Sequence, residues 1–287
     1  MKPAPFDFIA CADGPDALAQ VVARLAARDG DAKLASGTQS LGPMLNLRLA
    51  QPSQLLDISR FAALQSVGLI GAHTLRIGAA VTHARIEDGA LPDVTRGLLP
   101  SVAAHIAYRA VRNRGTLGGS LAHADPAADW VTVMTLLDAA IVIAGPAGER
   151  RVAASAFYDG PFTPRLQPDE LIAAVELPCG SADARWAYRK ACRKPGEFSE
   201  ATAALWVDAA RGVHRAVLGA LDGMPVVIEG VQALAALRTP AGVAAALDDA
   251  GVTDPHARAL HTAMLRRAFV DLDAFDATHA ARQAQAA

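Results

Sequence analysis

The 287-residue sequence is short of several features that define large classes of proteins. Its three cysteines, Cys11, Cys179 and Cys192, are far apart and show no C-x-x-C spacing. Four thiolates for an iron–sulfur cluster are therefore not available within this chain. The eight histidines include no H-E-x-x-H or other closely paired set, so we predict no metal site.

An excess of positive charge and long apolar runs are also lacking. Lys and Arg number 27 against 29 Asp and Glu, a net charge of −2, so no basic excess is present to bind nucleic acid. No apolar run reaches the roughly 18 residues of a membrane span, and Met1 to Asp7 lack the apolar core of a signal peptide. We therefore expect a cytoplasmic protein that neither binds nucleic acid nor inserts into a membrane.

The sequence does have enough apolar residues, 52%, to form more than one packed core, and we expect two domains. Up to Pro178 the pattern predicts alternating strands and helices, with strands at 6–9, 33–35, 54–58, 65–72, 74–80, 139–144, 149–152 and 169–177 and helices at 13–29, 41–49, 82–88, 98–108 and 126–136. Asp13 and Thr82 are expected to cap two of these helices. After Pro178 the pattern predicts three antiparallel strands and then three helices, at 185–192, 201–207, 213–221, 230–237, 241–250 and 255–269.

The most informative segment is Arg112 to Asp129, which reads R-N-R-G-T-L-G-G-S-L-A-H-A-D-P-A-A-D. It has few side chains that build a core and many backbone N–H groups that can approach a ligand closely. A cofactor that carries phosphate needs such groups. The segment therefore predicts a dinucleotide site.

A second segment, Ser36-Gly37-Thr38-Gln39-Ser40, follows a predicted strand and precedes a predicted helix. Taken alone, either segment is more often an ordinary turn. Both occur within one α/β domain, however, and two opposed groups of amides can hold a diphosphate from both sides without a cationic side chain. Neither segment matches G-x-G-x-x-G or G-x-x-x-x-G-K-[ST], so the site is neither a Rossmann nor a P-loop site.

These motifs resemble those of a known family over nearly the whole chain. The stretches K-L-A-S-G-T-Q-S-L-G-P-M-L-N-L-R-L-A-Q-P at 33–52 and V-R-N-R-G-T-L-G-G-S-L-A-H-A-D-P-A-A-D at 111–129 resemble the two FAD loops of the flavoprotein (medium) subunits of molybdenum hydroxylases, the carbon monoxide dehydrogenase and xanthine dehydrogenase relatives. Shorter matches follow in the same order, at Gly160-Pro161-Phe162, Glu170-Leu171-Ile172, Tyr188-Arg189-Lys190 and Arg193 with Gly196-Glu197-Phe198.

The resemblance implies a fold and a division of the chain. Residues 1–179 would form an FAD-binding domain of the vanillyl-alcohol-oxidase-like (PCMH) type, made of two α/β subdomains. Residues 180–287 would form a smaller α+β domain with an antiparallel sheet and helices, which covers the flavin region. The sequence departs from its relatives at Ser36, where Gly is common, at Thr38, where Gly, Gln or His is frequent, and at Glu197, where Asp is common.

The resemblance also implies the residues that contact FAD. Backbone groups of the two segments would hold the pyrophosphate, assisted by the hydroxyls of Thr116 and Ser120. A basic side chain near the ring system would favour reduced flavin, and both Arg189 and Lys190 are candidates. The expected contacts are Lys33, Leu34, Ala35, Ser36, Gly37, Thr38, Gln39, Ser40, Leu41, Ile106, Thr116, Gly118, Gly119, Ser120, Asp125, Asp129, Leu171, Ile172, Arg189 and Lys190.

By the same resemblance, the protein would carry one redox centre in a series of electron carriers. A small [2Fe-2S] subunit would deliver electrons that a large molybdopterin subunit takes from the substrate, and FAD would pass them to an external acceptor. Dimers of such heterotrimers are typical of the family. No residue here needs to act as acid, base or nucleophile, and we expect structural roles for His83, His105 and His123.

Two other functions are compatible with the residues. A stand-alone FAD oxidase would need its own base, for which His214 and His256 are the candidates after residue 180. A non-enzymatic interaction module would use the glycine segments only as turns. The substrate stays open among purines, N-heteroaromatics, aldehydes, carbon monoxide and acyl thioesters, and so does the electron acceptor.

Overall fold

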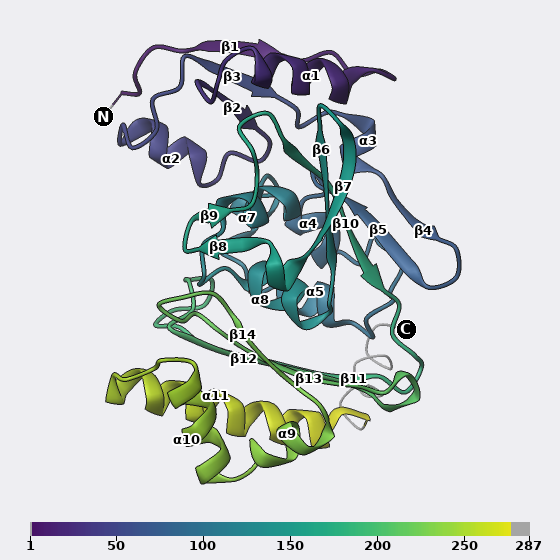
Figure 1. The fold of residues 1–287 in the computed structure, drawn as a ribbon, viewed down its shortest axis with the longest axis vertical. Helices are drawn as coiled ribbons and strands as arrows, with labels where there is room; N and C mark the ends of the chain where they lie inside the picture. Colours follow the sequence, from purple (N-terminus) through teal and green to yellow (C-terminus); the bar gives the residue numbers. More distant parts are fainter. Residues whose placement is uncertain (1, 277–287) are drawn as a thin grey trace.

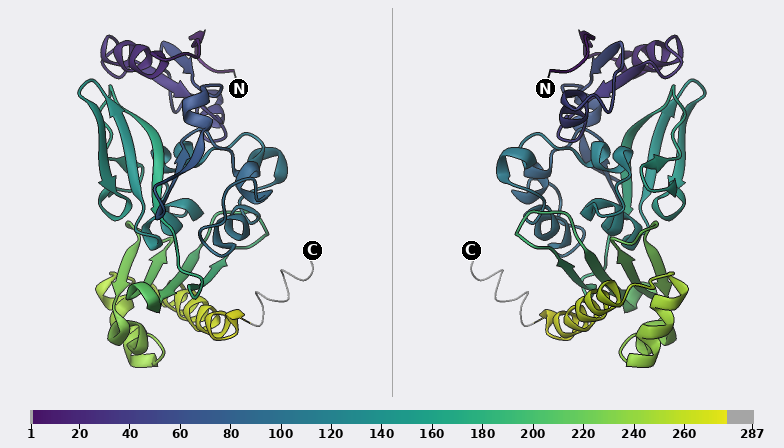
Figure 2. Two further views of the ribbon diagram at one scale, coloured as in Figure 1. Left: turned by 90° about the vertical axis from the view of Figure 1, so that its right-hand side faces the viewer. Right: turned by 90° about the vertical axis from the view of Figure 1, so that its left-hand side faces the viewer.

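The computed structural model describes residues 2–276 and arranges them in three layers, each built on its own sheet. The chain starts in the first layer, passes through the second and ends in the third (Figure 1). Figure 2 shows the same order from both sides, with the third sheet at the opposite end of the molecule from the first.

The first layer is a small parallel sheet with strand order β1-β3-β2. Parallel strands require crossover connections, and two helices supply them here. Apolar residues at positions 17, 21, 22 and 25 give the first of these helices one buried face. The elements are β1 (Asp7–Ala10), α1 (Ala17–Ala26), β2 (Ala32–Ala35), α2 (Leu41–Asn46) and β3 (Gln54–Asp57).

The second layer is a five-stranded antiparallel sheet with order β4-β5-β10-β6-β7. Its central strand β10 reads L-I-A-A-V-E-L-P, and seven of the eight residues are buried because neighbouring elements cover both faces. The strands are β4 (Val67–Ile70), β5 (Thr74–Gly78), β6 (Ala140–Gly145), β7 (Gly148–Ala153) and β10 (Leu171–Pro178).

Short helices and one small hairpin connect the strands of the second layer. They contribute to a core that is centred on Trp130, Phe61 and Phe157, all of which are inaccessible to solvent or nearly so. The elements are α3 (Ala62–Gln65), α4 (His83–Glu87), α5 (Leu98–Ala103), α6 (Arg109–Arg112), α7 (Leu117–His123), α8 (Asp129–Leu136), β8 (Tyr158–Gly160) and β9 (Thr163–Pro164).

The third layer is an antiparallel sheet in the order β11-β12-β13-β14, covered on its outer face by helices. Helix α8 of the second layer packs on the other face, so closely that a Cβ at Gly219 would lie 2.0 Å from Oγ1 of Thr132. The elements are β11 (Arg185–Ala191), β12 (Ala201–Asp208), β13 (Val213–Gly219), β14 (Val226–Glu229), α9 (Val231–Ala236), α10 (Pro240–Asp249) and α11 (Pro255–Asp273).

Several predicted helix ends differ from the observed ones. Thr82 caps α4 as expected, because its hydroxyl accepts from the Arg85 N–H. The Asp13 prediction is wrong, since α1 starts at Ala17 and the Asp13 carboxylate accepts instead from the N–H of Ala62. Helix α2 ends at Asn46, because Arg48 adopts a left-handed backbone (φ 59°).

Two further corrections concern residues near the glycine segments. The helix predicted from Pro126 starts at Asp129, because the Asp125 carboxylate accepts from the Ala127 N–H at 2.9 Å and closes a turn first. Helix α5 ends at Ala103, five residues before its predicted end, and leaves residues 104–108 as a loop. Between residues 2 and 276, no helix combines the length and the apolar character that crossing a bilayer requires.

Candidate functional site

The first glycine segment connects the end of β2 to α2. Thr38 has a left-handed backbone (φ 58°), which turns the chain sharply, and the Gln39 side-chain amide donates to the Gly37 carbonyl at 3.1 Å. No acceptor among the described residues receives a hydrogen bond from the backbone N–H groups of residues 37–41. A run of unpaired amides of this kind is suited to bind phosphate oxygens.

The second segment differs from the expected loop, because Leu117 to His123 form helix α7 and Thr116 is its N-cap. The Gly118 N–H donates to the Ala79 carbonyl at 2.9 Å, and the Gly119 N–H donates to Thr116 Oγ1 at 3.1 Å. The Ser120 N–H donates to the Thr116 carbonyl at 3.0 Å. The amides expected to hold a diphosphate here already have acceptors within the chain.

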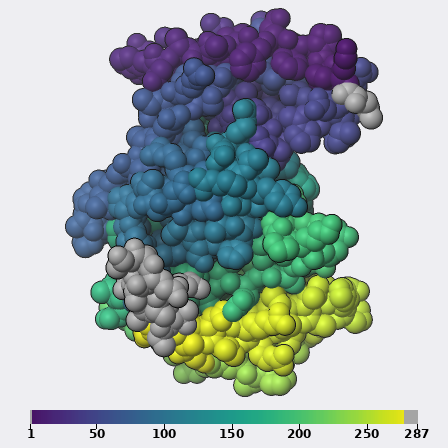
Figure 3. Space-filling model, turned by 180° about the vertical axis from the view of Figure 1, so that it is seen from behind, coloured from purple at the N-terminus to yellow at the C-terminus, as the bar shows by residue number. Residues whose placement is uncertain are grey.

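The two segments are nevertheless neighbours. Ser36 Oγ and Thr116 Oγ1 lie 3.1 Å apart and share a hydrogen bond. A Cβ on Gly37 would lie 2.2 Å from the Arg114 carbonyl oxygen, so only glycine permits this approach of the two backbones. Seen from behind, the surface is notched between the N-terminal layer, drawn in purple and blue, and the green part of the chain below it (Figure 3).

His83 and Trp130 support the second segment from inside the protein. The His83 N–H donates to the Gly115 carbonyl at 2.9 Å, and the Trp130 indole N–H donates to His83 Nδ1 at 3.0 Å. Burial, together with the nearby Arg112 guanidinium, lowers the pKa of His83 to about 4, so the imidazole is neutral. His83 has a structural role, as the sequence predicted.

Asp129, at the first turn of α8, lies in a buried polar cluster with two residues of β11. Lys190 Nζ is 3.0 Å from Asp129 Oδ1, and the two side chains are only 7% and 6% exposed. The same ammonium donates to the His105 carbonyl at 3.0 Å and to the Glu197 carbonyl at 3.3 Å. The Tyr188 hydroxyl donates to Asp129 Oδ1 at 2.6 Å. Asp129 and Lys190 are both predicted FAD contacts, and the structure brings them together with Tyr188, which the prediction did not include.

Arg189 lies on the other face of β11, because successive side chains of a strand alternate in direction. Its guanidinium donates to the carboxylate of Asp271 on α11, with one contact at 2.7 Å. Helix α11 covers the outer face of the third sheet. Of the two basic candidates, Lys190 belongs to the Asp129 cluster, and Arg189 belongs to the packing of the C-terminal helix.

Ile106 lies in the loop at 104–108, which Arg112 holds in place. The Arg112 guanidinium donates to the carbonyls of Ile106 and Ala107 at 2.9 and 2.8 Å and binds both carboxylate oxygens of Glu87. Arg112 is the first residue of the glycine-rich segment at 112–129. No pattern in that segment indicates that Arg112 holds the loop at 104–108. The loop in turn provides the His105 carbonyl to the polar cluster.

The remaining predicted contacts are distributed over three elements. Leu171 and Ile172, at the start of β10, are buried in the main core with 1% and 5% exposure. Asp125 is half-buried in the turn before α8. Lys33, Leu34 and Ala35 form β2 directly before the first segment, and their side chains range from exposed to buried. Ser40 is the N-cap of α2, and Leu41 is the first residue of this helix.

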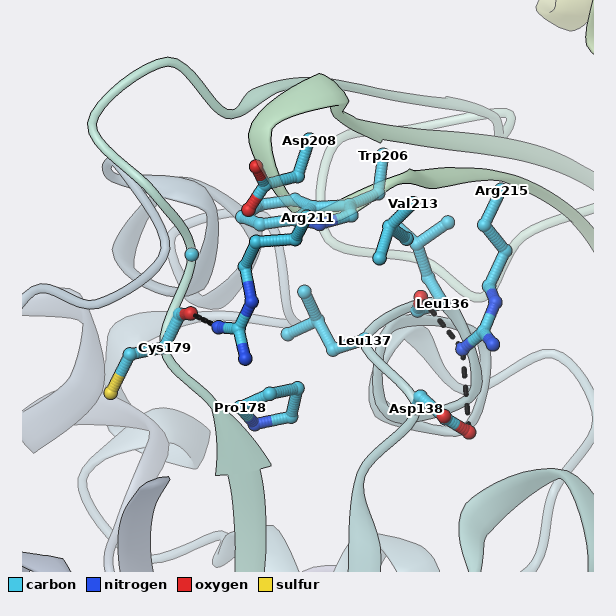
Figure 4. A pocket seen from close by; sticks show the side chains of 11 residues that line it. Leu136, Leu137, Asp138, Pro178, Cys179, Trp206, Asp208, Arg211, Val213 and Arg215 are labelled. Carbon is cyan, nitrogen blue, oxygen red and sulfur yellow. Dashed lines mark hydrogen bonds and ion pairs between the residues drawn. The ribbon is translucent and has the colours of Figure 1, made fainter. Parts of the chain in front are cut away.

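A separate cavity of about 260 Å³ lies at the other end of α8, between the second and third layers. Figure 4 shows Arg211 reaching across it to the Cys179 carbonyl and Arg215 extending toward Asp138, at 3.4 Å. Because Asp138 follows the last turn of α8 and Asp129 begins the helix, this cavity is distinct from the polar cluster.

Known proteins are similar to this chain in sequence and in fold. Residues 12–180 match the family model described as the FAD binding domain in molybdopterin dehydrogenase. The chain is 34% identical to caffeine dehydrogenase subunit beta of a Pseudomonas species over 210 residues, which are 73% of this chain and 70% of that protein. It is 35% identical to the carbon monoxide dehydrogenase medium chain of Hydrogenophaga pseudoflava over 205 residues, 71% of this chain and 70% of that one.

Solved structures are similar over almost the whole chain. The fold matches a chain of carbon monoxide dehydrogenase from Hydrogenophaga pseudoflava with a TM-score of 0.82 and 32% identity, covering 96% of this chain and 99% of that one. A chain of quinoline 2-oxidoreductase from Pseudomonas putida matches with a TM-score of 0.81 and 32% identity, covering 95% and 98%.

The chain therefore belongs to the family of FAD-binding domains of molybdopterin dehydrogenases. Its cofactor is FAD, and it is an FAD subunit of the molybdenum hydroxylase kind of oxidoreductase. The expected fold, an FAD domain followed by a C-terminal α+β domain with an antiparallel sheet, is confirmed.

Proposed function

We propose that this chain takes electrons from a [2Fe-2S] partner subunit and passes them from FAD to an external acceptor. The chain would work beside a large molybdopterin subunit in the cytoplasm, as part of a dimer of heterotrimers, and would not turn over substrate alone. Residues 1–179 would bind FAD and residues 180–287 would cover it. The support comes from the family and from relatives named as subunits or medium chains of dehydrogenases.

The observation that carries the cofactor site is the contact of the two segments at Ser36 and Thr116. The amides of residues 37–41 have no acceptor among the described residues, so they fit the oxygens of a pyrophosphate. The hydroxyls of Thr116 and Ser120 lie on the second segment and would assist. Both glycine amides already have acceptors, but Gly118 is buried against Ala79 whereas Gly119 is exposed. We therefore assign Gly118 to packing and expect Gly119 to face the cofactor.

The flavin ring would lie near the Asp129 and Lys190 pair, with Ile106, Asp125, Leu171 and Ile172 near it. When bound, FAD supplies a centre that accepts and releases electrons. Lys190 would provide positive charge that favours the reduced cofactor, while Asp129 would provide oxygens that accept hydrogen bonds. The chain itself would bind, orient and shield FAD without acid or base chemistry.

The alternative of a stand-alone oxidase is not favoured by the position of its candidate bases. Lys190 pairs with Thr202 at one end of the third sheet, whereas His214 pairs with Val207 near the other end. His256 is in the first turn of α11, on the outer face of the sheet. Neither histidine is close to the polar cluster, so neither is placed to take a proton from a substrate at the flavin.

The proposal is tested by expressing the chain with and without its two expected partner subunits. We expect the chain alone to carry FAD and to stay oxidised with every substrate of a panel of N-heteroaromatics, aldehydes and purines. The assembled complex should contain iron and molybdenum, and one substrate should reduce its flavin. Reduction of FAD by a substrate in the isolated chain would instead establish the oxidase.

A further inference from the structure

The Lys190 ammonium is surrounded by oxygen atoms from three parts of the chain. These are the carboxylate of Asp129 and the carbonyls of His105 and Glu197, at 3.0, 3.0 and 3.3 Å. An ammonium has three N–H donors, so this set uses all of them. Lys190 is therefore fixed in position, and it affects a neighbouring group through its charge more than through a further hydrogen bond.

Tyr188 is the other side chain bonded to Asp129. It stands two residues before Lys190 on β11, so both side chains lie on the same face of the strand. Its hydroxyl lies 2.6 Å from Asp129 Oδ1, a length typical of a hydrogen bond to a charged acceptor. Burial, and then the Asp129 charge, raise the pKa of Tyr188 well above its ordinary value, so the phenol keeps its proton and donates it.

Among the described residues, the carboxylate of Asp129 thus has two side-chain partners, and they have different effects. Lys190 balances its charge, and Tyr188 withdraws part of its electron density through the hydrogen bond. If the phenol hydroxyl is removed, the full negative charge of Asp129 stays in a buried site where, of the two described partners, only Lys190 remains. Reduction adds negative charge to a flavin, so a more localised carboxylate charge disfavours the reduced form.

We propose that Tyr188 is a positioning residue that orients the Asp129 carboxylate, limits its negative charge and thereby raises the reduction potential of the bound FAD. This inference rests on the proposed function, because it assumes that the flavin ring lies beside the Asp129 and Lys190 pair. It adds a residue and a task that the motifs of the two segments do not contain.

The test uses Tyr188→Phe in the full chain with FAD bound, and Tyr158→Phe as the matched control. Tyr158 is also buried, but its hydroxyl has no hydrogen-bond partner among the described residues. We expect Tyr188→Phe to fold, to bind FAD about 10-fold more weakly and to have a more negative potential in an anaerobic dye-coupled titration. Tyr158→Phe should change neither quantity.

A second pair of variants separates positioning from a general structural effect. In an Asp129→Asn background the carboxylate charge is absent, so adding Tyr188→Phe should leave the potential where Asp129→Asn alone put it. An equal shift in both backgrounds would mean that Tyr188 acts only on the fold, and an unchanged potential in Tyr188→Phe would also overturn the inference.

Should Tyr188→Phe fail to fold, a ring-fluorinated tyrosine at position 188 provides the opposite test. Its more acidic hydroxyl donates a stronger hydrogen bond, so the potential should become more positive, and no change would overturn the inference. Absence of FAD from the wild-type chain would refute the proposed function itself, and this outcome is distinct from a failure of the Tyr188 inference alone.

Discussion

The hydroxyl oxygens of Ser36 and Thr116 lie 3.1 Å apart although eighty positions separate the two residues in the sequence. Their hydrogen bond joins the first layer of the protein to the second at the site proposed for the FAD pyrophosphate. The segment around Ser36 has amides without an acceptor among residues 2–276, and the segment around Thr116 has hydroxyls at the start of a helix. In the proposed site, each segment would therefore supply groups that the other lacks.

Replacing Thr116 should affect both stability and cofactor binding. Thr116→Ala removes the N-cap of α7, which costs about 1 kcal/mol of unfolding free energy, and it also removes the bond to Ser36. We expect FAD to dissociate more readily, as measured by flavin fluorescence on dilution. Thr116→Ser should behave like the wild type, and Ser66→Ala, at an exposed serine outside both segments, is the control. Wild-type retention of FAD in Thr116→Ala would contradict the assigned site.

Gly118 and Gly119 should respond differently to the same substitution. A Cβ on Gly118 would lie 2.4 Å from the Cβ of Ala79, whereas a Cβ on Gly119 would meet only Thr116 Oγ1, at 2.8 Å. Gly118→Val should therefore destabilise the whole domain by overpacking, by about 1–3 kcal/mol or more. Gly119→Val should lower FAD occupancy with a smaller loss of stability.

Thermal unfolding and the ratio of flavin to protein absorbance measure the two effects. Gly68→Ala is the control, since no atom lies within 4 Å of its added Cβ. Full flavin occupancy in Gly119→Val, or equal destabilisation by the two valines, would argue against this division of roles.

Acid should destabilise the protein through His83. The unfolded chain has an ordinary pKa near 6.5 at this residue, and burial lowers the folded value to about 4. Between these values the unfolded state binds more protons, so the free energy of unfolding falls as the pH is lowered from 6.5 to 4, by about 3 kcal/mol in total.

Urea unfolding at several pH values measures this dependence. His83→Gln should be less stable at neutral pH but should lose less stability between pH 6.5 and 4 than the wild type does. The exposed His73 provides the control variant, His73→Gln, which should keep the wild-type dependence. A wild-type slope in His83→Gln would show that other groups cause the acid sensitivity.

Lys190 and Arg189 are neighbouring basic residues whose substitutions can be compared directly. Lys190→Gln leaves the Asp129 carboxylate buried without its cation, which should cost about 3–5 kcal/mol of unfolding free energy and weaken FAD binding. Arg189→Gln breaks a partly exposed ion pair with Asp271, worth about 1 kcal/mol at most, and should leave FAD binding unchanged. Flavin titration of both variants shows which of the two side chains supports FAD binding. A stronger effect of Arg189→Gln would assign the basic group near the flavin to Arg189 instead of Lys190.

Most of the fold could be predicted from the sequence because apolar periodicity and turn residues agree over long stretches. The hairpin at Gly145 to Gly148 and the three strands after residue 185 are examples. The elements that were missed include α3, α6 and β14, of four residues each, and the shorter β8 and β9, all too short for periodicity to reveal. Helix α7 was missed because its glycine-rich sequence is typical of a loop. Predicted helix ends were wrong where a local turn forms in place of the first helical turn. The turn that the Asp125 carboxylate closes before α8 is an example.

The candidate site was predictable only in part. The two glycine segments could be recognised from their composition. The sequence does not show, however, which of their backbone amides donate hydrogen bonds to acceptors within the chain. The Ala79 carbonyl accepts the hydrogen bond of the Gly118 N–H, and Ala79 lies in a segment with no motif. The choice between Arg189 and Lys190 depended on which face of β11 packs on α11, and that required the third sheet to be placed against its helices.

The close packing of Gly219 on Thr132 has a consequence for how the molecule can move. Helix α8 is buried along its whole length, with Asp129 at one end and the third sheet pressed against its side. A sheet that close leaves no room for sliding without carrying the helix along. A tilt of the C-terminal layer would thus be transmitted along α8 to the Asp129 carboxylate, at the place proposed for the flavin ring.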